Sequence, residues 1–125
     1  MAFIPFHELR VFQQAEQLCD EIWKLVRSWP YFEKDTLGKQ LVKAADSIGA
    51  NIAEGSGRAT KKDNQRFVRI SRGSLNETQY WLRRAKTRKL ISEKDENNLT
   101  AIIDVLAPAL NAYLNSLKKG PSTKR

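Results

Sequence analysis

The chain has 125 residues, of which 41% are hydrophobic and 29% are charged, so it is long enough for one domain with a hydrophobic core. Its formal charge of +8 and its isoelectric point near 9.8 favour anionic partners such as nucleic acid. It has a single cysteine, Cys19, and no apolar run near the roughly 20 residues that span a bilayer, so we expect a cytoplasmic protein with no disulfide, signal peptide or membrane segment.

Two helices are predicted in the first half of the chain. Apolar residues recur at steps of three and four over residues 6–29, and Pro30 follows where the helix is expected to end. A second helix is predicted over residues 36–54, with Asp35 as its N-cap. Gly55 comes next and is predicted to close this helix in the left-handed conformation.

A third, basic helix is predicted over residues 61–89. Thr60 can cap it, with Asp63 in the reciprocal position of a capping box. Three small hydroxyl residues lie on its apolar side, which predicts a tight crossing against the second helix and bonds back to the backbone. These residues are Ser71, Ser74 and Thr78.

A fourth helix is predicted over residues 93–118, with Ser92 as its N-cap. Four long helices, short connections and no strand-like alternation predict an all-α fold, an antiparallel up-down four-helix bundle. We expect the bundle domain to cover residues 1–119, and the basic tail, residues 120–125, to be mobile.

Positive charge is concentrated in residues 58–89, which hold eleven of the 22 Lys and Arg but only two of the 14 Asp and Glu. At 100° per residue, nine of these cations fall within an arc of about 160°. They are Arg58, Lys61, Lys62, Arg66, Arg69, Arg72, Arg83, Arg84 and Lys86. The residues predicted to be buried on the opposite side include Phe67, Ile70, Ser71, Thr78, Leu82 and Ala85.

This basic face has a functional and a purely structural interpretation. A run of charge on a helix is often only a solvated surface. Here the charge is nearly all of one sign, and Tyr80 projects among the arginines, where it could stack on a base while guanidinium groups hold phosphates. Tyr80 and Trp81 could instead serve an oligomer interface, because the three tryptophans exceed what one small core needs.

Catalytic motifs are weak. The one histidine, His7, has no carboxylates spaced to form a metal site with it, and Ser71 and Ser74 have no histidine partner. Glu54 and Glu77 could form a paired carboxylate site, but the preferred interpretation is a structural network of Asn51, Glu54 and Glu77 with helix-end amides or arginine. We therefore expect no enzymatic activity, no cofactor and no metal.

Two motifs carry a family resemblance. The segment QLVKAADSIGANIAEG matches a pattern through Gln40, Ala44, Ser47, Ile48, Asn51, Ile52, Ala53, Glu54 and Gly55. The segment GSLNE matches a second pattern through Gly73, Ser74, Leu75 and Glu77. The chain resembles the bacterial four-helix bundle proteins encoded in intervening sequences of large-subunit ribosomal RNA genes, and their relative, the accessory variability protein of diversity-generating retroelements.

The resemblance implies a homopentameric ring of four-helix bundles and, for the retroelement branch, nucleic-acid binding beside a reverse transcriptase. Our first hypothesis is therefore a non-enzymatic RNA- or DNA-binding homo-oligomer without marked sequence specificity. Its contact residues would be Lys62, Arg66, Arg69, Arg72, Tyr80, Arg83 and Arg84. The alternative is a protein–protein interaction module of the ribosomal intervening-sequence family that has no nucleic-acid role and binds a partner with an acidic surface.

Overall fold

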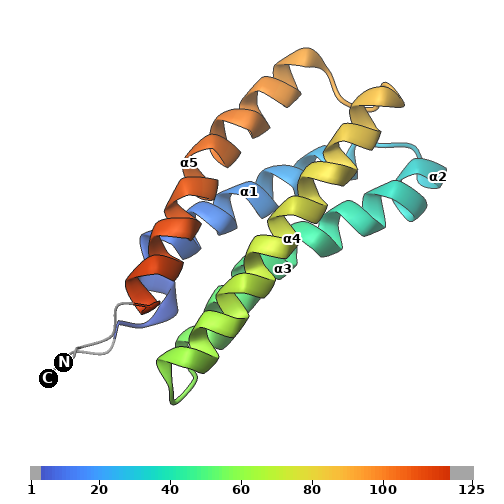
Figure 1. The fold of residues 1–125 in the computed structure, drawn as a ribbon. Coiled ribbons are helices and arrows are strands. Elements are labelled where there is room, and N and C mark those ends of the chain that lie inside the picture. The colour runs from blue at the N-terminus through green and yellow to red at the C-terminus, as the bar shows by residue number, and fades with distance from the viewer. Residues whose placement is uncertain (1–3, 119–125) are drawn as a thin grey trace, which may run out of the picture.

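A computed structural model describes residues 4–118, and every regular element within them is helical (Figure 1). A short 3-10 helix, η1 (Phe6–Glu8), precedes α1 (Arg10–Arg27). The next helix combines α2 (Tyr31–Glu33), the π-helical η2 (Lys34–Gly38) and α3 (Lys39–Ser56). The two longest helices, α4 (Lys61–Thr87) and α5 (Glu93–Lys118), complete the chain, which confirms an all-α helical bundle. The predicted tail, residues 120–125, lies outside the described residues.

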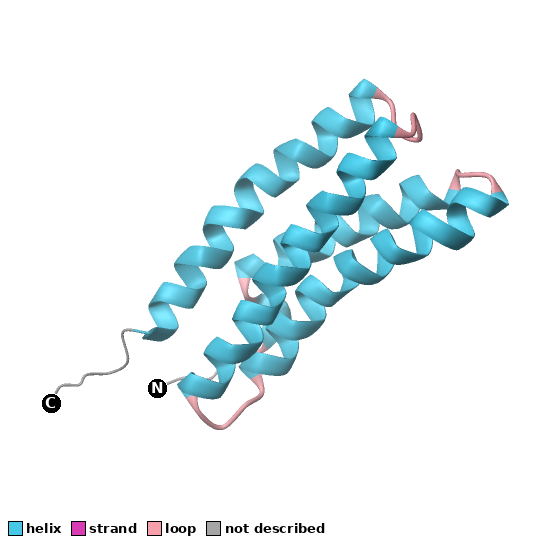
Figure 2. Ribbon diagram, turned by 45° about the vertical axis from the view of Figure 1, so that its right-hand side comes forward, coloured by secondary structure: helices cyan, strands magenta, loops and turns pink. Residues whose placement is uncertain are grey.

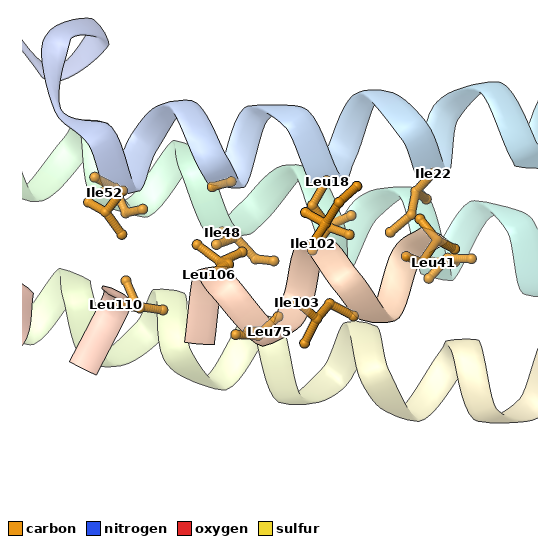
Figure 3. Packing of buried hydrophobic residues seen from close by; sticks show 14 of the residues in the cluster. Leu18, Ile22, Leu41, Ile48, Ile52, Leu75, Ile102, Ile103, Leu106 and Leu110 are labelled. Atoms are coloured by element: carbon orange, nitrogen blue, oxygen red, sulfur yellow. The ribbon is translucent and has the colours of Figure 1, made fainter. Parts of the chain in front are cut away.

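The four long helices lie side by side, and each packs against two of the others (Figure 2). α3 packs between α1 and α4, and α5 packs against α4 and α1. Short loops join neighbours, so adjacent helices run antiparallel. Figure 3 shows the side chains of Ile22, Leu41, Ile48 and Leu106 pointing into the space between the helices, with Ile22 near Leu41 and Ile48 near Leu106. Each of these four side chains is fully buried, and their burial is the main source of stability for such a bundle.

The second helix begins earlier than the sequence predicts. It starts at Tyr31, directly after Pro30, whose fixed φ of −61° suits the residue before a helix. Asp35 lies inside the helix, so its prediction as N-cap is wrong, and its carboxylate pairs with Lys39 at 3.4 Å instead. The prediction failed because we placed the start at a capping side chain, whereas the proline sets it.

The prediction that Gly55 closes this helix in the left-handed conformation is also wrong. Gly55 is buried within α3, and the helix ends at Gly57 with an ordinary φ of −89°. A Cβ at Gly55 would lie 2.5 Å from Oδ1 of Asn64 and 2.9 Å from Cβ of Phe67. The glycine is therefore needed because α4 comes close at this point.

The predicted caps of the two long helices are confirmed. Oγ1 of Thr60 accepts a hydrogen bond of 3.1 Å from the backbone of Asp63, and Oγ of Ser92 accepts one of 3.0 Å from the backbone of Asp95. The end of α4 is harder to locate from the sequence, because no glycine or proline closely follows it. There Lys89 has a φ of 62° and the backbone N–H of Leu90 bonds to the carbonyl of Ala85, which is a Schellman-type ending built on a lysine.

The predicted tight crossing between the second and third helices is the seam between α3 and α4. Ser71 and Thr78 are fully buried there. The Ser71 hydroxyl donates across the seam to the carbonyl oxygen of Ile48, whereas Thr78 donates to Ser74 in its own helix at 2.8 Å. Thr78 therefore bonds back as predicted, and Ser71 instead joins the two helices.

Candidate nucleic-acid interface

α4 has a buried side and an outward side. Val68, Leu75 and Ala85 are buried together with Ser71 and Thr78, and the cations lie on the other side of the helix. Ile70 departs from the prediction, because its side chain is 43% exposed rather than buried. It lies about 100° around the helix from Ser71, at the edge of the packed side.

The cations near the start of α4 are engaged with carboxylates and an aromatic ring. Asp63 pairs with Nε of Arg58 at 3.2 Å and with Nη2 of Arg66 at 3.0 Å. Both guanidinium groups also stack over the Phe67 ring, with their Cζ atoms 4.7 and 4.5 Å from its centroid. Glu54 approaches Arg58 at 3.7 Å. We call Glu54, Arg58, Asp63, Arg66 and Phe67 the Asp63 cluster.

Six of the nine cations of this face form no ion pair with any residue from 4 to 118, and four of the six also form no side-chain hydrogen bond there. Lys61 is one of the four and lies toward the edge of the arc. The other three are Lys62, Arg69 and Arg83. They lie within about 60° of one another around the helix axis. We call them the open row. None of the three is in an ion pair within the described chain, although Arg83 lines a recess between α4 and α5 together with Glu96 and Asp104. Lys62 and Arg69 in particular remain available to an external anion.

Three further cations of this face have partners. Nη1 of Arg72 donates to Asn111 of α5 at 3.3 Å, and Nη2 of Arg84 approaches Thr87 at 3.5 Å. Lys86 pairs with Glu96 at 2.8 Å. Arg72 and Arg84 are bonded to neutral groups, so they keep their full charge on this face.

Tyr80 lies on the same outward side and is 53% exposed. Its ring contacts Trp81 edge-on, with the centroids 4.8 Å apart and the planes at 69°. Trp81 is itself fixed by a hydrogen bond of 3.1 Å from its indole N–H to Glu77. The exposed part of the Tyr80 ring is therefore held in place beside the open row.

At its N-terminal end the basic face contains a recess of about 360 Å³. Its lining includes the cations Lys62, Arg66 and Arg69, together with Thr60 and Asp63. The Asp63 cluster that shapes this recess was missed from the sequence. The signal was present, because Arg58 follows Glu54 by four residues and Arg66 follows Asp63 by three, and both are pairing distances on a helix.

The network predicted for Asn51, Glu54 and Glu77 does not form. Asn51 donates to the backbone of Ser47, Glu54 pairs with Arg58, and Glu77 accepts from Trp81. Within residues 4–118, the Ser74 hydroxyl forms no hydrogen bond to Asn51, Glu54 or Glu77. The seam explains the separation, because Ser71 lies opposite Ile48 and Asn64 lies opposite Gly55. In that register the two carboxylates lie roughly 18 Å apart along the helices.

Other candidate chemistry is scarce in the described chain. Over residues 4–118, no group of three or more His, Cys, Asp and Glu side chains is placed to hold a metal ion. No helix among the same residues is long and apolar enough to cross a bilayer. Burial, with a contribution from the Asp46 carboxylate, raises the pKa of the Cys19 thiol to about 12, so the thiolate that would react is scarce near neutral pH.

Fold and surface together define a class: a small antiparallel helical bundle that presents unpaired cations and an exposed tyrosine along one outer helix. The comparison with protein families is more specific. The model of the 23S rRNA-intervening sequence protein family matches residues 7–112, from η1 to the middle of α5. The chain therefore belongs to the 23S rRNA-intervening sequence protein family. A search of curated proteins gives no match.

Proposed function

We propose that this protein binds nucleic acid, without catalysis, through the outward face of α4. The observation that carries the proposal is the open row of Lys62, Arg69 and Arg83, whose charges lack a partner in the described chain. Like charges close together on a helix cost stability and contribute nothing to the fold. An anionic ligand would supply the missing counterions.

The shape of this face favours contacts to phosphates over readout of bases. The open row spans 22 residues of α4, from Lys62 to Arg83, or roughly 31 Å along the helix axis. Arg72 and Arg84 add charge on its two sides, and Tyr80 offers one stacking surface. Contacts of this kind release counterions, so binding should weaken steeply with salt and depend little on sequence.

A double charge reversal tests the face directly. The variant Arg69→Glu/Arg83→Glu should reduce the affinity for a structured RNA by about 100-fold or more at low salt, and should flatten the salt dependence. The measurement is fluorescence anisotropy across a salt series, with circular dichroism to confirm unchanged helicity. Both positions are exposed, so the bundle should tolerate the change.

A matched control separates the local face from the net charge. Lys24→Glu/Lys94→Glu lowers the formal charge of +8 by the same amount, at exposed positions on α1 and α5. The control should keep most of the affinity. Equal losses in the two double variants would mean that only the overall charge attracts RNA, and the assignment of the α4 face would then be wrong.

We also propose that the protein acts as a homo-oligomer, with five copies as the family resemblance implies. Several copies would multiply a modest attraction per subunit through avidity. Support comes from large apolar side chains left exposed on the described chain, among them Trp23 and Val105. Native mass spectrometry measures the number of copies, and a monomer at micromolar concentration would contradict this part of the proposal.

A role as accessory factor of a reverse transcriptase is the most specific form of the proposal. The basic outer face supports it, because such a factor would bind the template or product of that enzyme. The test is co-purification of a reverse transcriptase, encoded nearby, with the tagged protein from its own cells. Recovery of the protein without the enzyme, under conditions that preserve RNA binding, would restrict the function to nucleic-acid binding alone.

The alternative function is a protein–protein interaction module. One observation favours it, an apolar groove between α1 and α3 that is edged with cations. The two functions differ in a simple measurement. A preparation from lysate with a high ratio of absorbance at 260 and 280 nm favours nucleic acid, whereas a clean protein that shifts no RNA in a gel favours the protein partner.

A further inference from the structure

The outward face of α5 is unusual for a chain in which 29% of the residues are charged. Over residues 97–117, only Asp104 carries a charge. Ala101, Val105 and Pro108 are exposed, and the Val105 side chain is 55% exposed. We call Ala101, Asp104, Val105 and Pro108 the α5 ridge. A surface helix normally carries charge on its solvent side, so the composition of this ridge indicates that something covers it.

A complementary surface lies between α1 and α3. This α1/α3 groove has a volume of about 570 Å³, and apolar side chains including Val26 and Val42 form part of its lining. Trp23 also lines it and is 53% exposed. Four cations line the same groove: Arg27, Lys34, Lys39 and Lys43. Asp46 is its one acidic lining residue.

We propose that the α5 ridge of one copy docks in the α1/α3 groove of a second copy. This inference rests on the proposed self-association and adds the surfaces that produce it. The small apolar side chains of the ridge would cover the Trp23 indole, and Asp104 would meet the cations of the groove. Of those cations, only Lys39 forms an ion pair within the described residues, with Asp35 at 3.4 Å, so the groove retains charge for a carboxylate.

The two surfaces lie on different sides of the bundle (Figure 1). α1 packs between α3 and α5, so the groove between α1 and α3 does not face in the same direction as the outer side of α5. An interface between different patches is heterologous, and repetition of it closes into a ring or extends into a filament. Asp104 and Arg83 line one recess between α4 and α5, so the α5 ridge borders the C-terminal end of the open row. Lys62 and Arg69 line neither this recess nor the groove, so assembly would leave them accessible.

The groove suits a protein segment better than a nucleic acid. Most of its apolar lining is aliphatic, with the single indole of Trp23, so it offers little surface on which bases could stack. A helix with apolar residues and one acid is the complementary shape and charge. The α5 ridge of this chain has that composition, which is why we assign the groove to a second copy.

The test uses one variant for each surface in the full-length protein. Val105→Lys should disable the ridge, because its cation would meet the cations of the groove, and Trp23→Glu should disable the groove, because its carboxylate would meet Asp104. Each variant should therefore be monomeric by native mass spectrometry while the unaltered protein is oligomeric. A mixture of the two variants should form dimers and nothing larger, because one intact ridge can still enter one intact groove. Val105→Gln and Trp23→Gln provide milder versions should a charged variant lose helicity.

Ile70→Glu is the matched control, because Ile70 is an exposed apolar residue of α4 outside both surfaces. It should leave the oligomer unchanged. Retention of the full oligomer by either surface variant, or its loss in the control, would overturn the docking assignment but leave self-association intact. A monomeric unaltered protein would overturn both. RNA binding is measured separately and does not enter either outcome.

Discussion

The two sides of α4 differ in how much space surrounds them. On the inward side, a Cβ added at Gly55 of the facing helix would come within 3.1 Å of three atoms of α4. On the outward side, a Cβ added at Gly73 would meet nothing within 4 Å. The inward side is closely packed and uncharged, whereas the outward side is open and cationic. One helix thus holds the fold together with one side and leaves the other free for a ligand.

This contrast implies that stability and binding can be changed separately. Substitutions on the inward side should alter the free energy of unfolding, because they disturb a close-packed seam. Substitutions on the outward side should alter ligand affinity and leave the unfolding free energy nearly constant. Four predictions, ordered by the size of their effect on stability, test how complete this separation is.

The largest effect is expected for Gly55→Ala. The added methyl group would overlap Oδ1 of Asn64 and Cβ of Phe67, which lie 2.5 and 2.9 Å from its position. Overpacking of this kind should destabilise the bundle by about 2 kcal/mol, which lowers the melting temperature by roughly 5–10 °C. Thermal unfolding followed by circular dichroism measures it, and an unchanged or raised melting temperature would contradict the close approach of α3 and α4.

The second effect is expected for Ser71→Ala. Ser71 is fully buried, and its hydroxyl donates to the carbonyl of Ile48 across the seam. Loss of this hydrogen bond should cost about 1 kcal/mol, because alanine fits the same space and no large cavity results. Urea unfolding measures the cost. Thr87→Ala, which removes an exposed hydroxyl that bonds to its own helix, is the control and should change stability by less.

The third effect has the opposite sign and is expected for Gly73→Ala. Gly73 lies inside α4 with open space around it, so alanine adds helix propensity without a clash. The bundle should gain about 0.5–1 kcal/mol, chiefly because the unfolded chain loses freedom. An increase in the midpoint of urea unfolding with an unchanged slope is the expected result. A decrease would show that the outward side is covered at Gly73.

The sequence predicted the long elements of this fold because their signals are local. Apolar periodicity located the helices, and Thr60 and Ser92 marked the starts of α4 and α5 correctly. The errors at Asp35 and Gly55 have a common cause. Each residue type has several structural uses, and other residues decide between them: Pro30 sets the start of the helix that contains Asp35, and α4 passes close over Gly55.

The sequence predicts which side of α4 carries the candidate site, but not which of its cations form ion pairs. Helical spacing alone placed Arg69 and Arg83 on the outward side. It could not show that Asp63 and Phe67 hold Arg66 while Lys62 remains unpaired, because these contacts depend on rotamers and on the turn that brings Arg58 back to α4. The sequence likewise could not show that the seam register separates the two glutamates predicted to meet.

The smallest effects are expected for one variant in the open row and one in the Asp63 cluster, and the two changes in unfolding free energy should have opposite signs. Arg69 has Arg66 and Arg72 three residues away on either side and no ion pair in the described chain, so Arg69→Gln removes repulsion. Arg66→Gln removes an ion pair of 3.0 Å to Asp63 and a stacking contact with Phe67. At low ionic strength the first variant should therefore stabilise the bundle by a few tenths of a kcal/mol, and the second should destabilise it by about 0.5 kcal/mol.

Salt distinguishes these two causes. The stabilisation by Arg69→Gln should fade at 1 M salt, where the Debye length falls to about 3 Å, because screening removes the repulsion in the parent protein as well. The destabilisation by Arg66→Gln should persist in part, since its contact with the Phe67 ring is short and partly apolar. Urea unfolding at two salt concentrations measures both. If the two variants shift stability in the same direction at low salt, the outward cations are not divided into paired and unpaired groups, and the open row loses its distinction as a binding surface.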